Sequence, residues 1–375
     1  MKRILTYTLF FIAMLLSSCS KRNYTNAIPS NSVALITVNA MDFVNGNSPF
    51  SHIVTPFVSD DKKELKGIDL TKNIYIFETA DGMIGFCAPI SDAYELESFL
   101  KRMKELKAVS DFSDIDDVTF CTISDSWLIG FDNDMLLAMG PITGNDAKKS
   151  MKHRMVKMMN QEEEDGITKS QLWQHSEEVK SPMRLVAQAS ALPEQIIASM
   201  MIGAPKGTDP ADVLIEASME YKDNTLYLNG SACSYNTNVK QAMKKVEECY
   251  KPITFNWEKM LSDSTLIGVF TNVNGKDFVE HLQTNKALNT MLMGCSAYDR
   301  IRDNNGDLAI LLTPKDMTSL EENVTCRVVN IAKGNVKNKE CFIVAINLGA
   351  IKGPVKNVMS PFLGKINRIV YRINK

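Results

Sequence analysis

Histidine is scarce in this sequence, and the local motifs of common metal sites are missing. The four histidines occur singly, as His52, His153, His175 and His281. No His-x-x-x-His or His-Glu-x-x-His spacing puts two ligands on one helix face. No Cys-x-x-Cys spacing occurs either, so the usual sign of a zinc knuckle or a redox pair is absent. We therefore interpret the histidines as surface or core residues and expect no metal and no cofactor.

Motifs of common enzymes are missing as well. There is no Gly-x-Ser-x-Gly, although a catalytic triad can also form from distant positions. Gly275-Lys276-Asp277 follows Gly268 with the wrong spacing for a phosphate loop and indicates a strand-to-helix turn. Residues 303–307 lack calcium-loop spacing and indicate a tight turn. The question of enzymatic activity stays open, with a non-catalytic role favoured.

An excess of positive charge is also missing. The chain has 42 Lys and Arg against 44 Asp and Glu. Loss of Lys2 and Arg3 with a leader would make the balance slightly more acidic. This argues against nucleic acid, or an anionic membrane face, as the main partner.

The sequence does contain an export signal at its N-terminus. Lys2 and Arg3 precede an uncharged apolar stretch at residues 4–16, and two serines then precede Cys19. This order is typical of a cleaved signal peptide. A transmembrane helix would need about 20 apolar residues. We therefore predict that residues 1–18 are a signal peptide.

Leu16-Ser17-Ser18-Cys19 resembles the lipobox of bacterial lipoproteins. In such proteins the thiol receives diacylglycerol, cleavage falls before the cysteine, and a fatty acid such as palmitate acylates the new amino group. The resemblance implies lipid attachment at Cys19. Several acyl chains form a stable anchor, since each buried methylene contributes about 0.8 kcal/mol. The alternative is an ordinary secretory signal with a chance cysteine.

The remaining chain is long enough for about two domains. Residues 19–31 show no periodicity and predict a tether between membrane and fold. A methionine-rich helix predicted at 146–161 ends in the acidic run 162–166, which is unfavourable at a helix C-terminus. This run predicts a boundary between an N-terminal α+β domain at 32–165 and a C-terminal α+β domain at 166–375.

Apolar runs and amphipathic stretches predict an α+β fold. We expect repeated strand-helix-strand-strand units that form largely antiparallel sheets with helices packed on one face. Asp81-Gly82 predicts a hairpin with a type I′ turn, and a second hairpin is predicted about Lys222-Asp223-Asn224. Strands at 325–331 and 340–347 are expected to pair with each other. Further strands are predicted at 33–38, 118–123, 127–131, 135–139, 184–191, 265–271, 307–313 and 366–373, and further helices at 92–107, 193–202, 239–249, 276–293 and 355–363.

Two stretches share a pattern of a turn, a buried strand and a helix opened by aspartate. They are residues 30–44, with Asp42-Phe43-Val44, and residues 262–279, with Asp277-Phe278-Val279. The period between such units is not fixed, so internal duplication and chance similarity both remain open.

Ala27-Ile28-Pro29 and the strand after it, with the lipobox and the later strand-helix units, resemble a known family. This is the family of Bacteroidales cell-envelope lipoproteins carrying a domain of unknown function, the 4836 family. The resemblance implies an α+β repeat fold and a cell-envelope location, and it transfers no catalytic residue. Ser20 differs from the aspartate that retains some lipoproteins in the inner membrane. Lys21-Arg22-Asn23 lacks the acidic run of surface-export signals, so a periplasm-facing outer-membrane lipoprotein is expected.

The primary hypothesis is a non-catalytic binding or structural component with an envelope protein or glycan as partner. An alternative is a carrier of a lipid or other apolar ligand, with the methionines of 146–161 lining its cavity, although core packing is the favoured explanation of these side chains. Another alternative is an envelope glycan or peptide hydrolase. Its catalytic carboxylates would come from among Asp111, Asp114, Asp116 and Asp117.

Two further interpretations concern modification. Asp263-Ser264-Thr265 resembles an envelope O-glycosylation acceptor, which implies that Ser264 carries the glycan. An odd number of cysteines remains beside Cys19, and most lie in apolar runs that predict buried side chains, with their disulfide status left open. They are Cys87, Cys121, Cys233, Cys249, Cys295, Cys326 and Cys341.

Overall fold

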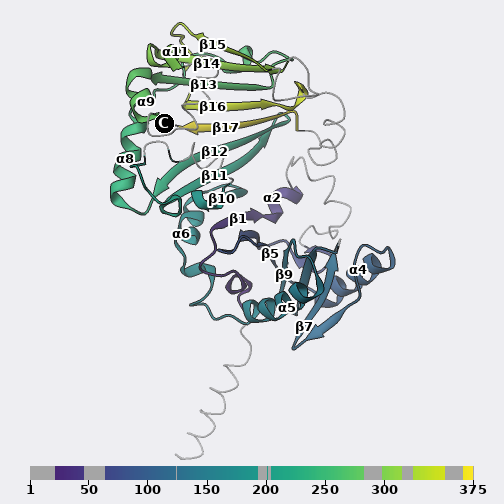
Figure 1. Ribbon diagram of the computed structural model, residues 1–375. Coiled ribbons are helices and arrows are strands. Elements are labelled where there is room, and N and C mark those ends of the chain that lie inside the picture. The colour runs from purple at the N-terminus through teal and green to yellow at the C-terminus, as the bar shows by residue number, and fades with distance from the viewer. Residues whose placement is uncertain are drawn as a thin grey trace, which may run out of the picture. The chain divides into compact units, whose positions relative to one another are not determined.

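The computed structural model describes residues 22–45, 64–123, 125–192, 201, 204–282, 298–314, 324–350 and 366–374 (Figure 1). The described part is mostly β, with a large mixed sheet and a few helices. The signal peptide, the helix predicted at 355–363 and most of the helix predicted at 193–202 lie outside these residues.

The chain forms two compact units that interleave in sequence. Among the described residues, unit 1 takes 22–30, Lys66–Asp69 and Gly85–Lys169. Unit 2 takes the described parts of Asn31–Leu65, Leu70–Ile84 and Ser170–Lys375. The consecutive domains proposed from the sequence, 32–165 and 166–375, stay a prediction.

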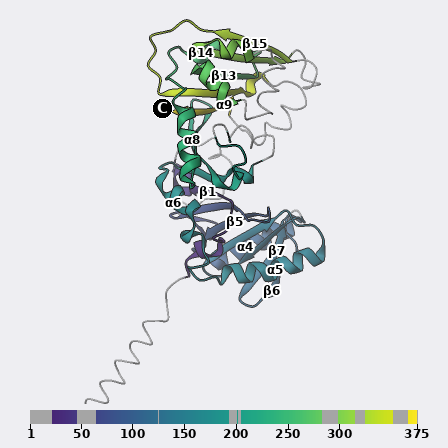
Figure 2. The ribbon, with the colours of Figure 1, turned by 60° about the vertical axis from the view of Figure 1, so that its left-hand side comes forward.

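Unit 2 is organised around a run of neighbouring strands in the order β15-β14-β13-β16-β17-β12-β11-β10-β1-β4. Figure 1 labels the strands of this run from β15 to β1, and Figure 2 shows β13, β14 and β15 after a turn of 60°. Neighbours pair antiparallel, except for β12 and β17, which run parallel. The bounds are β1 Ala34–Asn39, β4 Asn73–Glu78, β10 Met183–Gln188, β11 Val213–Lys222, β12 Thr225–Ser234, β13 Ile267–Asn274, β14 Asn305–Pro314, β15 Val324–Asn330, β16 Glu340–Asn347 and β17 Arg368–Asn374.

The α-helices described in unit 2 are α2 Ala40–Asn45, α6 Gln171–Glu178, α8 Thr237–Glu247, α9 Gly275–Leu282 and α11 Tyr298–Arg302. Short 3-10 turns are η4 Ala189–Ala191, η5 Pro210–Asp212, η6 Trp257–Met260 and η7 Leu348–Ala350, and a two-residue strand, β2, spans Glu64–Leu65. At both places that share the sequence pattern, a strand leads directly into a helix, β1 into α2 and β13 into α9.

Helices contact both faces of the unit 2 sheet. Leu172 of α6 packs with Leu214 of β11, whereas Val239 of α8 packs with Val213 and Ile215 of the same strand. Adjacent residues of a strand point to opposite faces, so α6 and α8 lie on opposite sides. The expectation that helices pack on one face is therefore wrong for this pair. The apolar run at the start of β11 has side chains on both faces of the sheet. A helix therefore packs against each face at this point.

The pairing expected between the strands at 325–331 and 340–347 is also wrong. Strand β15 pairs with β14, and β16 lies between β13 and β17. Strand β13 is the reason, because residues 270–273 are all buried, Phe270 and Val273 completely. A buried central strand needs a partner on each edge to satisfy its backbone polar groups, and β14 and β16 take those two edges.

The two hairpins expected from the sequence differ in their turns. In the β11–β12 hairpin, Lys222 pairs with Thr225, and Asp223 and Asn224 have φ of 51° and 58°, as a two-residue type I′ turn requires. The type I′ prediction for Asp81-Gly82 is wrong, since only Gly82 has positive φ. Thr79 N donates to Met83 O at 2.9 Å, which lengthens that loop to three residues.

Unit 1 contains the neighbouring strands β5-β9-β8-β7-β6 and two helices, α4 and α5. Helix α4 begins after Asp92, whose Oδ1 accepts from Glu95 N at 2.9 Å. Its buried Leu96 and Leu100 pack in a cluster with Phe131 and Leu136 of the sheet. The bounds are β3 Ile68–Asp69, β5 Ile84–Pro89, α4 Ala93–Glu105, β6 Ser113–Ile115, β7 Val118–Ile123, β8 Trp127–Phe131, β9 Met135–Gly140, α5 Asn145–Met159 and the 3-10 turns η1 Tyr24–Ala27 and η3 Ile167–Lys169.

The tether predicted at 19–31 is wrong for its described part, which is folded onto unit 1. Ala27 and Ile28 are completely buried, and Ile167 N donates to Ile28 O at 2.8 Å. Arg22 pairs with Asp132 at 2.6 Å, and its guanidinium also donates to Asn160 Oδ1 at 2.6 Å. A single 3-10 turn is too short to show a periodic pattern, so the sequence does not predict this folded segment.

Substituting Gly275 should destabilise unit 2 strongly. A Cβ at this position would lie 1.6 Å from the carbonyl oxygen of Ile301, so α9 and α11 could not keep their approach. We expect Gly275→Ala to lower the free energy of unfolding by more than about 3 kcal/mol. Gly207→Ala is the matched control, because Gly207 has φ +84° but open space around it, and left-handed strain alone costs about 1–2 kcal/mol. Urea denaturation measures the free energy of unfolding of both variants. Equal losses in the two would contradict a steric clash between a Cβ at position 275 and Ile301.

Candidate functional site

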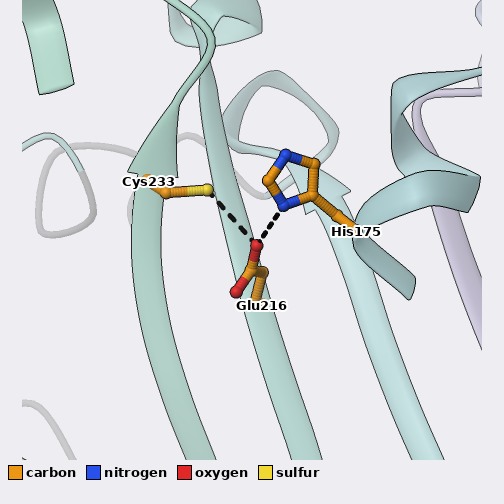
Figure 3. A group of neighbouring side chains, drawn as sticks. All are labelled: His175, Glu216 and Cys233. Atoms are coloured by element: carbon orange, nitrogen blue, oxygen red, sulfur yellow. Dashed lines mark hydrogen bonds and ion pairs between the residues drawn. The ribbon is translucent and has the colours of Figure 1, made fainter. Parts of the chain in front are cut away.

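A histidine, a glutamate and a cysteine meet in unit 2 (Figure 3). His175 comes from α6, Glu216 from β11 and Cys233 from β12. One ligand-type atom from each lies within 4.8 Å of the other two. All three side chains are half-buried, so the group is held by the fold but remains open to solvent.

The register of the β11–β12 hairpin brings two of these residues together. Glu216 lies opposite Ser231, and Leu214 lies opposite Cys233. Side chains two positions apart on a strand share a face, so Glu216 and Cys233 are diagonal neighbours on the face that α6 covers.

Packing of α6 supplies the third residue. Ser170 caps the N-terminus of the helix, because its Oγ accepts from Trp173 N at 3.1 Å. Leu172 is buried with Val186 and Leu214 on the sheet. His175 follows Leu172 by three residues and so lies on the same side of the helix. Burial of Leu172 therefore turns the imidazole toward β11 and β12.

Both polar contacts meet at one oxygen of Glu216, as Figure 3 shows. His175 Nδ1 lies 2.6 Å from Glu216 Oε1, and Cys233 Sγ donates to the same oxygen at 3.3 Å. The other carboxylate oxygen, Oε2, accepts from Ser231 Oγ at 3.2 Å. The His175 ring packs against Tyr235, with ring centroids 5.6 Å apart. Glu216 is thus the centre of the cluster.

The cluster keeps its thiol protonated. Burial raises the pKa of Cys233 to about 12, and the charge of Glu216 adds to the rise, while Lys240 acts in the opposite direction. Burial also raises the pKa of Tyr235, with smaller contributions from Cys233 and Glu216. A cysteine nucleophile needs a lowered pKa, so this thiol is poorly suited to covalent catalysis without a further positive charge beside it.

No local sequence pattern indicates this cluster. From the sequence, His175 is predicted to be an ordinary surface or core residue and Cys233 a buried hydrophobe. His175 is 41 residues from Glu216, and Glu216 is 17 residues from Cys233, so no local spacing connects them. The one available signal was a carboxylate, Glu216, that follows the apolar run Val213-Leu214-Ile215.

Among the residues that the structure describes, the other histidines and cysteines form no such cluster. His153 is exposed on α5, and His52 and the side chain of His281 lie outside the description. Burial of the cysteines is confirmed for Cys87, Cys121, Cys249 and Cys341, whereas Cys233 and Cys326 are half-buried.

The carboxylates proposed for a hydrolase are spread over a solvated hairpin. Asp111, Asp114, Asp116 and Asp117 are all exposed. Asp111 pairs with Lys104 at 2.6 Å, which lowers the pKa of its carboxyl, and Asp114 accepts from Thr119 Oγ1 at 2.8 Å. Their surroundings do not favour a role as catalytic carboxylates.

The methionines proposed for a carrier cavity are core residues of unit 1. Met151, Met155, Met158 and Met159 of α5 are buried, and α5 contacts η1, β6, β8 and β9. The core-packing interpretation of these side chains is therefore confirmed.

Two predicted modification sites stay predictions. Leu16-Ser17-Ser18-Cys19 lies outside the described residues. Ser264 is exposed, with its Oγ 3.0 Å from Ser262 Oγ, so an acceptor role at this hydroxyl is sterically open.

A family model described as "Domain of unknown function (DUF4836)" matches residues 56–345, well over half of the chain. The chain belongs to this DUF4836 family. The matched range includes His175, Glu216 and Cys233, so the cluster lies within the family domain. No curated protein matches the chain.

Two crystal forms of TP0453 are similar to this DUF4836 chain among solved structures. Form IV has a TM-score of 0.35 at 9% identity and covers 56% of this chain and 80% of that one. Form III has a TM-score of 0.37 at 11% identity and covers 60% of this chain and 86% of that one. Similarity at this level carries no argument about function.

Removing the charge of Glu216 should make Cys233 more reactive. Glu216→Gln takes away the carboxylate that raises the thiol pKa, so the thiolate fraction should increase while burial keeps the pKa above its usual range. We expect alkylation of Cys233 by iodoacetamide at pH 9, with chelator present, to accelerate several-fold, as measured by peptide mass spectrometry. Glu220→Gln, on the same strand, should leave the rate unchanged. An unchanged or slower rate in Glu216→Gln would rule out this coupling.

Proposed function

We propose that this DUF4836 protein is a Bacteroidales envelope lipoprotein anchored through Cys19 in the outer membrane and facing the periplasm. In this proposal it acts as a non-catalytic binding or structural component with an envelope protein or glycan as partner. The observation that carries the proposal is the order of a charged start, an apolar stretch and Leu16-Ser17-Ser18-Cys19. We also propose that β1–α2 and β13–α9 derive from a duplicated unit.

The beginning of the folded chain supports a close attachment. Arg22 is already bound to Asp132 and Asn160 of unit 1. Only Ser20 and Lys21 separate it from Cys19, so the anchor and the fold are at most about 11 Å of extended chain apart. A lipid on Cys19 would then hold unit 1 beside the bilayer surface instead of on a long tether.

The polar groups described in the two units favour binding over catalysis. The thiol of Cys233 is held protonated, and Asp111, Asp114, Asp116 and Asp117 are solvated. Among the described residues, no helix is long and apolar enough to cross a membrane.

Replacing Cys19 should release the protein from membranes. Cys19→Ala removes the thiol that would carry diacylglycerol, and with it the apolar surface that holds the chain on the bilayer. We expect the wild-type protein in the membrane pellet and the variant in the soluble envelope fraction, as measured by immunoblotting after fractionation. Cys87→Ala, which alters a buried free thiol of unit 1, is the control and should stay in the pellet. Membrane retention of Cys19→Ala would refute the anchor.

The folded N-terminal segment should protect the attachment point from trypsin. Asp132→Asn combined with Asp134→Asn removes both carboxylate partners of Arg22 and leaves the cleavage site in place. We expect trypsin to release the double variant from membrane vesicles several-fold faster than wild type, with cleavage located by N-terminal sequencing. Asp117→Asn, in an exposed turn of the same unit, should have no effect. Rapid release of the wild-type protein would show that Arg22 does not restrain this segment.

A further inference from the structure

We propose that His175, Glu216 and Cys233 bind one divalent transition-metal ion, with zinc as the best fit to the three donor types. The inference goes beyond the proposed lipoprotein function and does not depend on the lipid anchor, because all three residues lie in unit 2.

The donor set indicates the metal. Zinc sites in proteins are built from Cys sulfur, His nitrogen and carboxylate oxygen, whereas magnesium and calcium prefer oxygen ligands alone. Three protein ligands with an open fourth position are typical of zinc sites that accept water or a further ligand. The partial exposure of His175, Glu216 and Cys233 leaves that fourth position accessible.

The spacing of the donors is close to that of a tetrahedral site. With metal–ligand distances of about 2.0–2.3 Å, neighbouring donor atoms lie roughly 3.3–3.7 Å apart. The pairs here are 2.6 Å for His175 Nδ1 to Glu216 Oε1 and 3.3 Å for Cys233 Sγ to the same oxygen, with the third pair within 4.8 Å. To reach tetrahedral geometry, the distances between donor atoms must change by about 1 Å or less. Side-chain rotations can supply such changes without moving β11 or β12.

Charge balance also favours a divalent ion. At present a ring nitrogen and a thiol crowd around one carboxylate oxygen. On metal binding the thiol loses its proton to solvent, and the thiolate and the carboxylate together balance the two positive charges of the ion. The cluster would then be neutral with all three side chains coordinated.

The fold holds the donors before any metal arrives. Glu216 and Cys233 are fixed by the hairpin register, and Leu172 packs α6 against the same face. Ser231 donates to the carboxylate oxygen that does not contact His175, and a contact of this kind orients a metal ligand. The competing explanation is a hydrogen-bonded cluster that needs no metal, and experiment can separate the two.

The test uses the full chain, stripped with a chelator and titrated with zinc chloride by isothermal calorimetry. We expect one equivalent of zinc to bind and equimolar magnesium to give no signal. Cobalt(II) chloride should give the near-ultraviolet absorption of a thiolate–cobalt bond together with visible bands of a tetrahedral ion.

Single substitutions assign the ligands. His175→Ala, Glu216→Gln and Cys233→Ser should each weaken zinc binding by roughly 100-fold or more. Mutating residues that only support metal ligands costs about 10–100-fold in affinity, so loss of a ligand itself should reach at least the upper end of that range. Cys233→Ser should also abolish the thiolate–cobalt absorption. Three matched controls should bind as wild type. These are His153→Ala on α5, Cys326→Ser on β15 and Cys19→Ala at the predicted lipid-attachment position.

Circular dichroism checks that each variant is folded, and the cobalt spectrum of the wild type gives an answer even if one variant does not fold. The proposal fails if the wild type binds no zinc, if the cobalt complex shows no thiolate absorption, or if folded His175→Ala and Cys233→Ser bind as wild type. An equal loss of zinc affinity in the control variants would show that the metal binds elsewhere, and this result would also overturn the proposal.

Discussion

The register of the β11–β12 hairpin is the constraint on which the rest of the candidate site depends. A shift of one residue in a strand moves every side chain to the opposite face of the sheet. The two-residue turn at Asp223 and Asn224 pairs Lys222 with Thr225, and the ladder then runs unbroken to Val213 and Ser234. Through this register Glu216, Ser231 and Cys233 lie on the face beneath α6, and Ile215 lies on the face beneath α8.

Apolar packing and the polar cluster have different tasks in this arrangement. Leu172, Val186 and Leu214 are buried together, and complete burial of such a side chain stabilises a fold by about 1.5–3 kcal/mol. A hydrogen bond of the cluster contributes a net of only about 0.5–1.5 kcal/mol. Packing therefore holds α6 on the sheet, and the three polar side chains can rearrange around a ligand without unfolding their surroundings.

Much of the secondary structure could be predicted from the sequence because it follows local patterns. The hairpin β11–β12 follows from two strand-like runs about the turn at Asp223-Asn224, and α4 from its apolar spacing and the Asp92 cap. What depends on partners distant in the chain was missed. Nothing in the local sequence of β16 shows that it lies between β13 and β17, and nothing in residues 24–28 shows that unit 1 buries them.

The candidate site was hidden for the same reason. His175, Glu216 and Cys233 come from a helix and two strands, and the register that unites them belongs to the folded sheet. The absence of a local zinc motif therefore argues only against a metal site built from neighbouring residues. It does not argue against a site whose ligands are distant in the sequence.

The most direct test of this account is anomalous X-ray diffraction at the zinc absorption edge from crystals of the zinc-loaded protein. The account predicts one strong anomalous peak in unit 2, within bonding distance of His175 Nδ1, a carboxylate oxygen of Glu216 and Cys233 Sγ. A map with no peak among these three atoms, while the side chains keep their hydrogen bonds, would contradict it.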